Sequence, residues 1–300
     1  MYFTAIDEIV LPEYTGSAWR GLFGKGLKKT LCPVAHTKCN LCQLKQTCHY
    51  VFLFENHLQN NSKKYSANPY ILNVPIKKRP KTIKKNETFY LNFNLFGDKS
   101  NIILPAIINA FIIAGRAGFK HKKFTPIRLE NIDTIKSDKN TIWQPKISLQ
   151  EYIIPDIAPI LPHTKEYLEI IYLTPQRYKY HNRLIDVNSF NFNNWLSALL
   201  NRINAINELF ADKKIQPLDI KKIINENKNI KIEYLKISKQ NIIRYSTRQQ
   251  TKMNLDGIVG EVILKNKNIQ FILPYLHLGQ FINIGKSTTM GLGRFCIIHI

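Results

Sequence analysis

The sequence predicts an α+β protein with two domains in tandem. In the N-terminal half, segments of strand and helix character follow the order strand, helix, strand, strand, helix, strand. The C-terminal half repeats a strand, helix, strand pattern with additional strands. The stretch 134–165 between them is mixed and rich in proline, which is typical of a linker or a long loop. We therefore expect an N-terminal domain over 1–140, a linker over 141–166 and a C-terminal domain over 167–300.

Each element expected in the N-terminal half rests on the spacing of its apolar residues. Alternating apolar residues predict strands, and apolar residues three and four positions apart predict helices. Ser17 is a candidate cap for a first helix with lysines on its polar side. The expected strands are 2–9, 49–55, 69–75, 88–96 and 124–132, and the second expected helix is 102–114.

The C-terminal half contains the clearest helix pattern of the chain. Apolar residues from Trp195 to Leu209 recur on one helical face, and a shorter helix is expected over 218–224. The expected strands are 167–174, 231–238, 242–247, 258–265, 269–273 and 294–300.

The charge balance indicates a polyanionic partner. The chain has 43 Lys and Arg against 21 Asp and Glu, a formal net charge of +22 and a pI near 9.7. Such an excess costs self-repulsion and is typical of nucleic-acid-binding proteins. No basic amphipathic helix of the membrane-surface type is present, and the longest apolar run is shorter than the roughly 20 residues that span a bilayer. Since no signal peptide is visible, we expect a soluble, cytoplasmic protein without a membrane partner.

Four of the five cysteines lie in one short segment with the spacing C-x6-C-x2-C-x5-C. In a cytosolic protein, clustered cysteines favour a metal site over disulfides. The central pair can chelate one ion from a tight turn, and the outer two can complete a tetrahedron. We expect a structural zinc in an insertion over about 32–48, with an iron–sulfur cluster or free thiols as alternatives. The expected ligands are Cys32, Cys39, Cys42 and Cys48.

A glycine-rich stretch, Gly285–Arg294, precedes the final expected strand. It is not a nucleotide-binding P-loop, because Gln280 stands where that motif requires glycine. Glycines let backbone N–H groups approach phosphates, and the terminal lysine and arginine of this motif supply positive charge. A second segment, 244–250, mixes cations, an aromatic ring and amides, which suits backbone tracking and base stacking. The alternatives are an ordinary glycine-rich hairpin and a solvated edge strand.

Three blocks occur in an order that is typical of one family. They are 11–24 with the cysteines and 50–55, then 95–97 with 115–118, then 245–249 with 256–260 and 284–293. Together they resemble the CRISPR-associated endoribonucleases of the RAMP superfamily that process precursor CRISPR RNA, in a cysteine-containing subgroup. The resemblance implies two ferredoxin-like (RRM-like) domains and a C-terminal glycine-rich loop that grips RNA. It further implies cleavage of CRISPR repeat RNA without a catalytic cofactor.

The resemblance makes CRISPR repeat RNA, as precursor and as mature product, the expected partner. Other subunits of a CRISPR effector complex are further candidates, and the oligomeric state stays open. The residues expected to bind RNA are Arg20, Arg244, Tyr245, Ser246, Arg248, Gln249, Lys286, Ser287, Thr288, Thr289 and Arg294.

Metal-independent RNA cleavage uses the 2′-hydroxyl as nucleophile and gives 2′,3′-cyclic phosphate and 5′-hydroxyl ends. It needs a general base, a general acid and a cation near the phosphate. The resemblance puts the catalytic residues on or after the first helix. We expect His36 to transfer protons, because histidine titrates near neutrality, and Lys29 and Tyr14 to assist it.

Arg20 departs from the pattern of some relatives, which carry a histidine early in the first helix. Arginine does not readily act as a base. Two alternatives to a nuclease therefore stay open. One is a non-catalytic RAMP subunit that binds guide RNA in an effector complex, and the other is a general zinc-containing RNA-binding protein of another pathway.

Overall fold

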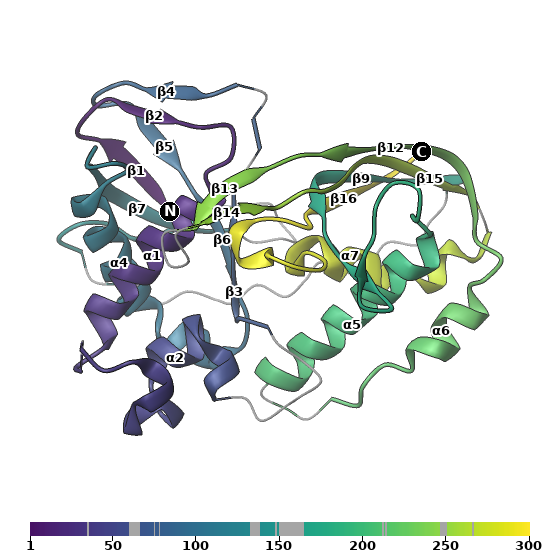
Figure 1. Cartoon of the computed structure of the whole chain (residues 1–300), viewed down its shortest axis with the longest axis horizontal. Helices are drawn as coiled ribbons and strands as arrows, with labels where there is room; N and C mark the ends of the chain where they lie inside the picture. The colour runs from purple at the N-terminus through teal and green to yellow at the C-terminus, as the bar shows by residue number, and fades with distance from the viewer. Residues whose placement is uncertain are drawn as a thin grey trace. The chain divides into compact units, whose positions relative to one another are not determined.

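The computed structural model of the chain describes residues 1–34, 36–59, 67–74, 76–77, 79–132, 139–147, 149, 165–211, 213, 215–246, 251–265 and 267–300. The chain divides into two compact units. Unit 1 comprises Met1–Pro159 and Leu209–Asp212, and unit 2 comprises Ile160–Glu208 and Lys213–Ile300. Both units combine helices with antiparallel sheets, which confirms the predicted α+β class (Figure 1).

Unit 1 contains a four-stranded antiparallel sheet in the order β5-β1-β7-β8. Two smaller ladders pair β2 with β4 and β3 with β6. The strands are β1 (Tyr2–Ala5), β2 (Ile9–Leu11), β3 (Tyr70–Asn73), β4 (Lys81–Ile83), β5 (Thr88–Tyr90), β6 (Asn92–Leu95), β7 (Phe124–Ile132) and β8 (Lys139–Trp143). The helices are α1 (Gly16–Leu31), η1 (Cys39–Leu41), η2 (Gln43–Gln46), α2 (His49–Phe54), η3 (Asn56–Leu58), α3 (Asp98–Ile102) and α4 (Leu104–Ala117).

Aromatic packing holds α1 against the sheet of unit 1. The buried Phe3 ring of β1 lies 5.2 Å from the rings of Trp19 and Phe124. Helices α1 and α4 approach so closely that a Cβ at Gly26 would overlap the carbonyl oxygen of Ala110. The orientation of α1 is therefore fixed, and with it the start of the cysteine-containing segment.

Unit 2 contains an antiparallel sheet in the order β12-β15-β9-β16. Its main elements follow the order β9-α5-β12-β15-α7-β16, the β-α-β-β-α-β pattern. These elements are β9 (Tyr167–Gln176), α5 (Phe192–Phe210), β12 (Lys231–Gln240), β15 (Gly257–Lys265), α7 (Leu273–Ile282) and β16 (Phe295–His299). The additions are a β10–β11 hairpin (Lys179–Tyr180, Arg183–Leu184), α6 (Ile220–Glu226), a β13–β14 hairpin (Ile243–Ser246, Thr251–Asn254), η4 (Lys267–Phe271) and η5 (Thr288–Met290).

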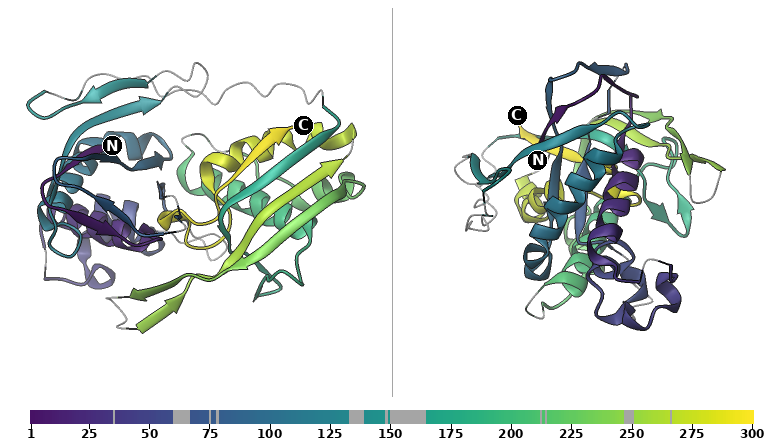
Figure 2. Two further views of the ribbon diagram at one scale, coloured as in Figure 1. Left: turned by 90° about the horizontal axis from the view of Figure 1, so that it is seen from above. Right: turned by 90° about the vertical axis from the view of Figure 1, so that its left-hand side faces the viewer.

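Helices α5 and α7 lie on one face of this sheet (Figures 1 and 2). Trp195 of α5 is fully buried, with its ring 5.4 Å from that of Tyr172 in β9 and 5.0 Å from that of Phe295 in β16. A Cβ at Gly279 of α7 would lie 2.8 Å from Leu199 Cδ1, so the two helices touch. The segment between α7 and β16 is consequently anchored at both ends.

Three local predictions are wrong. Residues 49–55, expected as a strand, contain helix α2, and residues 269–273, also expected as a strand, lead from η4 into α7. Both are short apolar runs, whose periodicity does not separate a strand from a buried helix. Ser17 lies inside α1, and the residue before that helix is Thr15.

The apolar stretch 102–114 forms the end of α3 and most of α4. Ile107, Ala110 and Phe111 are completely buried on the side of α4 that faces the core. Within the described ranges, no helix combines the length and the apolar character needed to cross a bilayer.

Candidate nucleic-acid interface

The glycine-rich loop connects α7 to β16 and follows a backbone path that few residue types can adopt. L-residues with a side chain rarely have positive φ, whereas glycine does so at no steric cost. The positive φ angles between α7 and β16 are those of Asn283 (54°), Gly285 (81°), Ser287 (64°), Gly291 (85°) and Gly293 (76°). The glycine content of the motif is thus set by the loop geometry.

The loop packs directly on the residues that follow β9. A Cβ at Gly285 would overlap the carbonyl oxygen of Arg177, and a Cβ at Gly293 would overlap that of Ile284. The backbone N–H of Lys286 donates to the Arg177 carbonyl at 2.6 Å. The alternative of an ordinary, self-contained hairpin therefore does not describe this segment.

Two buried side chains of β9 tie the loop to the sheet. Thr174 Oγ1 donates to the carbonyl of Gly291 at 2.9 Å and accepts the backbone N–H of Arg294 at 2.9 Å. Gln176 Nε2 donates to the Arg294 carbonyl at 3.0 Å, and its Oε1 accepts from Trp195 Nε1 at 3.3 Å. These bonds hold the loop in one shape, which leaves little ordering to be done when a ligand binds.

Exposure differs sharply among the predicted RNA-binding residues of the loop. Lys286 is exposed, whereas Ser287, Thr289 and Arg294 are half-buried and Thr288 is buried. The lysine ammonium is thus the loop's most accessible cation, while Thr288 serves mainly to pack the loop.

The first three residues of the second predicted RNA-binding segment, Arg244–Ser246, lie in β13, which pairs with β14 and extends from the β12–β15 pair (Figure 2). Arg244 is half-buried, and its Nη2 donates to Met253 Sδ at 3.1 Å. Tyr245 and Ser246 pair through their backbones with β14. Arg248 and Gln249 lie outside the described residues.

Arg20 is a packing residue of unit 1 as well as a cation. Its guanidinium lies 4.3 Å from the ring centroid of Phe54, a favourable cation–π contact. Burial raises the pKa of Tyr70, and the nearby charge of Arg20 opposes that rise. The side chain therefore joins α1 to α2 and β3.

The three predicted catalytic residues do not form one cluster. Lys29 is exposed in the last turn of α1, and His36 is exposed in the turn region beyond its end. Half-buried Tyr14 precedes the helix at its other end. At 1.5 Å per residue, α1 separates Tyr14 from Lys29 by about 20 Å. The length of the helix therefore keeps Tyr14 apart from Lys29.

The four clustered cysteines lie on the connection from α1 to α2, are half-buried and form no disulfide. Cys32 follows α1, Cys39 begins η1, Cys42 precedes η2 and Cys48 precedes α2. Burial raises the pKa of Cys39. Among the described residues, no three His, Cys, Asp or Glu side chains are grouped in a way that could hold a metal. Four thiolates are suitable ligands for zinc, but the side chains are not gathered around one point. The zinc site therefore stays a prediction.

Two family models match the chain. One, described as the CRISPR-associated endoribonuclease Cas6, matches residues 170–295, which include β12, β15, most of β9 and the glycine-rich loop. The other, AF_1859_N, N-terminal domain, matches residues 1–153. By this match, residues 170–295 form a Cas6-family domain. The resemblance drawn from the three sequence blocks is thereby confirmed.

Similar proteins extend this finding. An uncharacterized protein of Archaeoglobus fulgidus is 27% identical over 173 residues, which cover 56% of this chain and 57% of that protein. Cas6 of Thermus thermophilus in a product complex has a TM-score of 0.57 at 13% identity, covering 99% of this chain and 97% of that one. A partial Cas6-RT-Cas1–Cas2 complex has a TM-score of 0.55 at 13% identity, covering 100% of this chain and 45% of the other. At such identities the structural likeness establishes a shared Cas6 fold.

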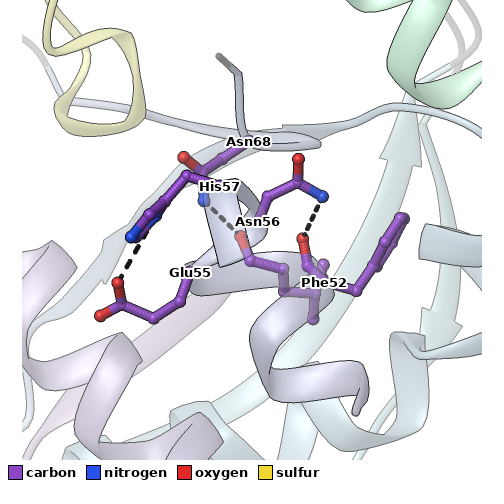
Figure 3. A network of polar contacts seen from close by, with 6 residues as sticks. Phe52, Glu55, Asn56, His57 and Asn68 are labelled. Atoms are coloured by element: carbon purple, nitrogen blue, oxygen red, sulfur yellow. Dashed lines mark hydrogen bonds and ion pairs between the residues drawn. The ribbon is translucent and has the colours of Figure 1, made fainter. Parts of the chain in front are cut away.

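One pair of residues in this chain was missed by the sequence reasoning. His57 Nδ1 lies 3.8 Å from Glu55 Oε2 at the end of α2 (Figure 3). The turn is braced by Asn56 Nδ2, which donates to the Phe52 carbonyl at 3.1 Å, and by Asn68 Nδ2, which donates to the Leu53 carbonyl at 2.7 Å. A histidine oriented by a carboxylate is a common arrangement for proton transfer. The Glu-x-His pattern after an apolar run was the available signal.

The anchoring residues Thr174 and Gln176 also received no role from the sequence. They precede the loop by more than 100 residues, and only the pairing of β9 with β16 brings them to it. The stretch Thr174–Arg177 fits the family resemblance, but nothing in it indicates this anchoring role.

Proposed function

We propose that this Cas6-family chain binds CRISPR repeat RNA and cleaves it to produce mature crRNA. The observation that carries the proposal is the glycine-rich loop, braced by Thr174 and Gln176, with Lys286 exposed upon it. An exposed lysine on a loop of fixed shape is a favourable site for a phosphate. The net charge of +22 supplies the long-range attraction that RNA binding needs.

We further assign both units to the ferredoxin-like fold. The strand order β16-β9-β15-β12 and the β-α-β-β-α-β order of elements support this assignment for unit 2. In unit 1, β1 lies between β5 and β7, and α1 and α4 are the two helices. The segment with the cysteines is then an insertion after the first helix of unit 1.

The proposed reaction needs no metal. A base removes the proton of the 2′-hydroxyl, the 2′ oxygen forms a bond to phosphorus, and the bond to the 5′ oxygen breaks. An acid then protonates that leaving oxygen, which yields the cyclic phosphate and 5′-hydroxyl ends. His36 is the proposed proton-transfer residue and Lys29 the proposed cation, because Lys29 is exposed in the last turn of α1 and His36 is exposed in the segment that follows it. The carboxylate-oriented His57 is a second candidate for proton transfer.

A second function is favoured by one observation, the separation of Tyr14 from Lys29 by the length of α1. A chain whose catalytic residues are not assembled would hold guide RNA beside other CRISPR proteins without cutting it. Incubation with repeat RNA without added divalent metal distinguishes the two functions. Discrete cleavage supports the nuclease, whereas tight binding of intact RNA supports the non-catalytic subunit.

We also propose that Cys32, Cys39, Cys42 and Cys48 bind a structural zinc. Their chemistry, their spacing and their common position between α1 and α2 support this assignment. Elemental analysis should find one zinc per chain, and a Cys39→Ser/Cys42→Ser variant should lose it and melt at lower temperature. Cys296→Ser, in β16, is the matched control and should keep the metal. Iron with sulfide would support the iron–sulfur alternative, and no metal would contradict both.

A further inference from the structure

A cavity of about 230 Å³ opens in unit 2 beside the β10–β11 hairpin, where β9 ends and β15 begins. Apolar side chains of Leu184, Val187 and Ile258 contribute to its walls. Arg177 and Asp256 also line it. The cavity is smaller than the roughly 300–1,000 Å³ typical of pockets for drug-sized ligands, so it suits one small planar group.

A fixed carboxylate forms the polar side of this cavity. Asp256 Oδ2 lies 3.2 Å from Lys239 Nζ, and Asp256 Oδ1 accepts the backbone N–H of Ile242 at 3.1 Å. The Arg177 guanidinium donates to the backbone carbonyl of the same aspartate. With an exposed fraction of 18%, the Asp256 side chain is both held in place and reachable from the cavity. Such an oxygen accepts hydrogen bonds from amino groups, including those of nucleobases.

Arg177 connects this cavity to the glycine-rich loop. Its carbonyl accepts the N–H of Lys286, and its backbone pairs with Gly285, while its side chain lines the cavity. A strand of RNA whose phosphate lies at the loop therefore has a neighbouring base within reach of the cavity.

The rim of the cavity has the composition of a nucleic-acid surface. The β10–β11 hairpin exposes Lys179 and Arg183. At its tip, the Tyr180 side chain is 43% exposed, and its ring lies 4.2 Å from that of His181. Cations beside aromatic rings bind phosphates and stack bases in single-stranded nucleic acid. The charge at the rim thus favours a polyanion over a neutral apolar ligand.

We propose that the cavity receives one base of the bound RNA, turned out of the strand, with its amino group bonded to Asp256. The faces of the base would contact Leu184 and Val187. This inference rests on the proposed binding of repeat RNA and adds a position at which the protein reads sequence. The shape of the cavity and the Asp256 carboxylate would then favour a base that carries an exocyclic amino group.

The test combines a variant whose cavity is filled with RNAs that lack one base. Val187→Trp fills the cavity, and Ile232→Trp, at the opposite end of β12 from Lys239, is the matched control. The affinity of each protein is measured by fluorescence anisotropy for repeat RNAs that carry one abasic nucleotide at successive positions. The affinity of the wild type and of Ile232→Trp should fall about fivefold or more when the abasic nucleotide stands at one particular position. Val187→Trp should bind intact RNA more weakly than the wild type by a similar factor. Its affinity should not fall further when the abasic nucleotide stands at that position.

A second variant keeps the proposal testable if Val187→Trp fails to fold. Asp256→Asn retains an oxygen that can accept the Ile242 N–H but removes the negative charge. At the sensitive position, removing only the amino group of the base should weaken binding to the wild type and leave binding to this variant unchanged.

The outcomes separate the two levels of the account. Identical abasic profiles in wild type, Val187→Trp and Asp256→Asn would overturn the base pocket while leaving repeat-RNA binding intact. Failure of the wild type to bind repeat RNA at all would overturn the proposed function itself.

Discussion

The hydroxyl of Thr174 accepts a hydrogen bond from the backbone N–H of Arg294 at 2.9 Å. This bond joins the glycine-rich loop to β9, an inner strand of the sheet. The same hydroxyl donates to Gly291, so one side chain fixes two points of the loop. The phosphate-binding geometry we propose is therefore built before RNA arrives. Its stability depends on β9 as much as on the glycines.

Replacing this hydroxyl tests the anchoring role. Thr174→Val keeps the shape of the side chain but leaves the N–H of Arg294 and the carbonyl of Gly291 without these partners. Buried polar groups without partners cost about 1–3 kcal/mol, so we expect a loss of that size in urea unfolding, together with weaker RNA binding. Thr88→Val, at an exposed position of β5, is the control. Equal stability of the two variants would contradict the anchoring role.

The glycines of the loop should resist even the smallest substitution. Gly285→Ala forces a side chain into positive φ and against the Arg177 carbonyl, so we expect destabilisation of at least about 1–2 kcal/mol. Gly21→Ala is the control, because a Cβ there meets nothing within 4 Å and alanine favours the α1 helix. Denaturant unfolding of both variants measures the difference. A Gly285→Ala protein as stable as the wild type would contradict the strain at this position.

Lys286 should contribute through its charge alone. Lys286→Ala should weaken RNA binding for all sequences and reduce the slope of log affinity against log salt by about one. Lys228→Ala, an exposed lysine in the turn after α6, should leave the slope nearly unchanged. RNA titrations at several salt concentrations measure this slope. An unchanged slope for Lys286→Ala would contradict a contact between Lys286 and a phosphate.

The identity of the proton-transfer residue is tested by two histidine variants. His36→Ala should lower the rate of repeat cleavage by about 100-fold or more while RNA affinity is kept, because proton-transfer catalysis contributes about 10²–10⁴-fold. His57→Ala serves as the comparison in single-turnover assays. If only His57→Ala loses cleavage, the Glu55–His57 pair performs the role that we assign to His36.

The sequence predicted those parts of the molecule whose signals are local. Strand β7 has the predicted bounds 124–132, and α5 contains the whole predicted apolar face from Trp195 to Leu209. Helix α2 was mistaken for a strand, because its six residues are almost all apolar and packing decides their conformation.

The candidate site was predictable only where its signals are local in the sequence. The glycine spacing revealed the loop, and the lysines and arginines revealed its charge. Thr174, Gln176 and the cavity at Asp256 depend on residues that only the sheet pairing brings together. Their roles therefore have no signature in any single stretch of sequence.

The most direct test of the central claim is the chemistry of the RNA ends. The protein is incubated with its repeat RNA without added divalent metal, and the fragments are analysed by mass spectrometry. We predict one discrete cut, with a 2′,3′-cyclic phosphate on the upstream fragment and a 5′-hydroxyl on the downstream fragment. Repeat RNA that is bound but remains intact, or fragments that appear only when a divalent metal is added, would contradict the account.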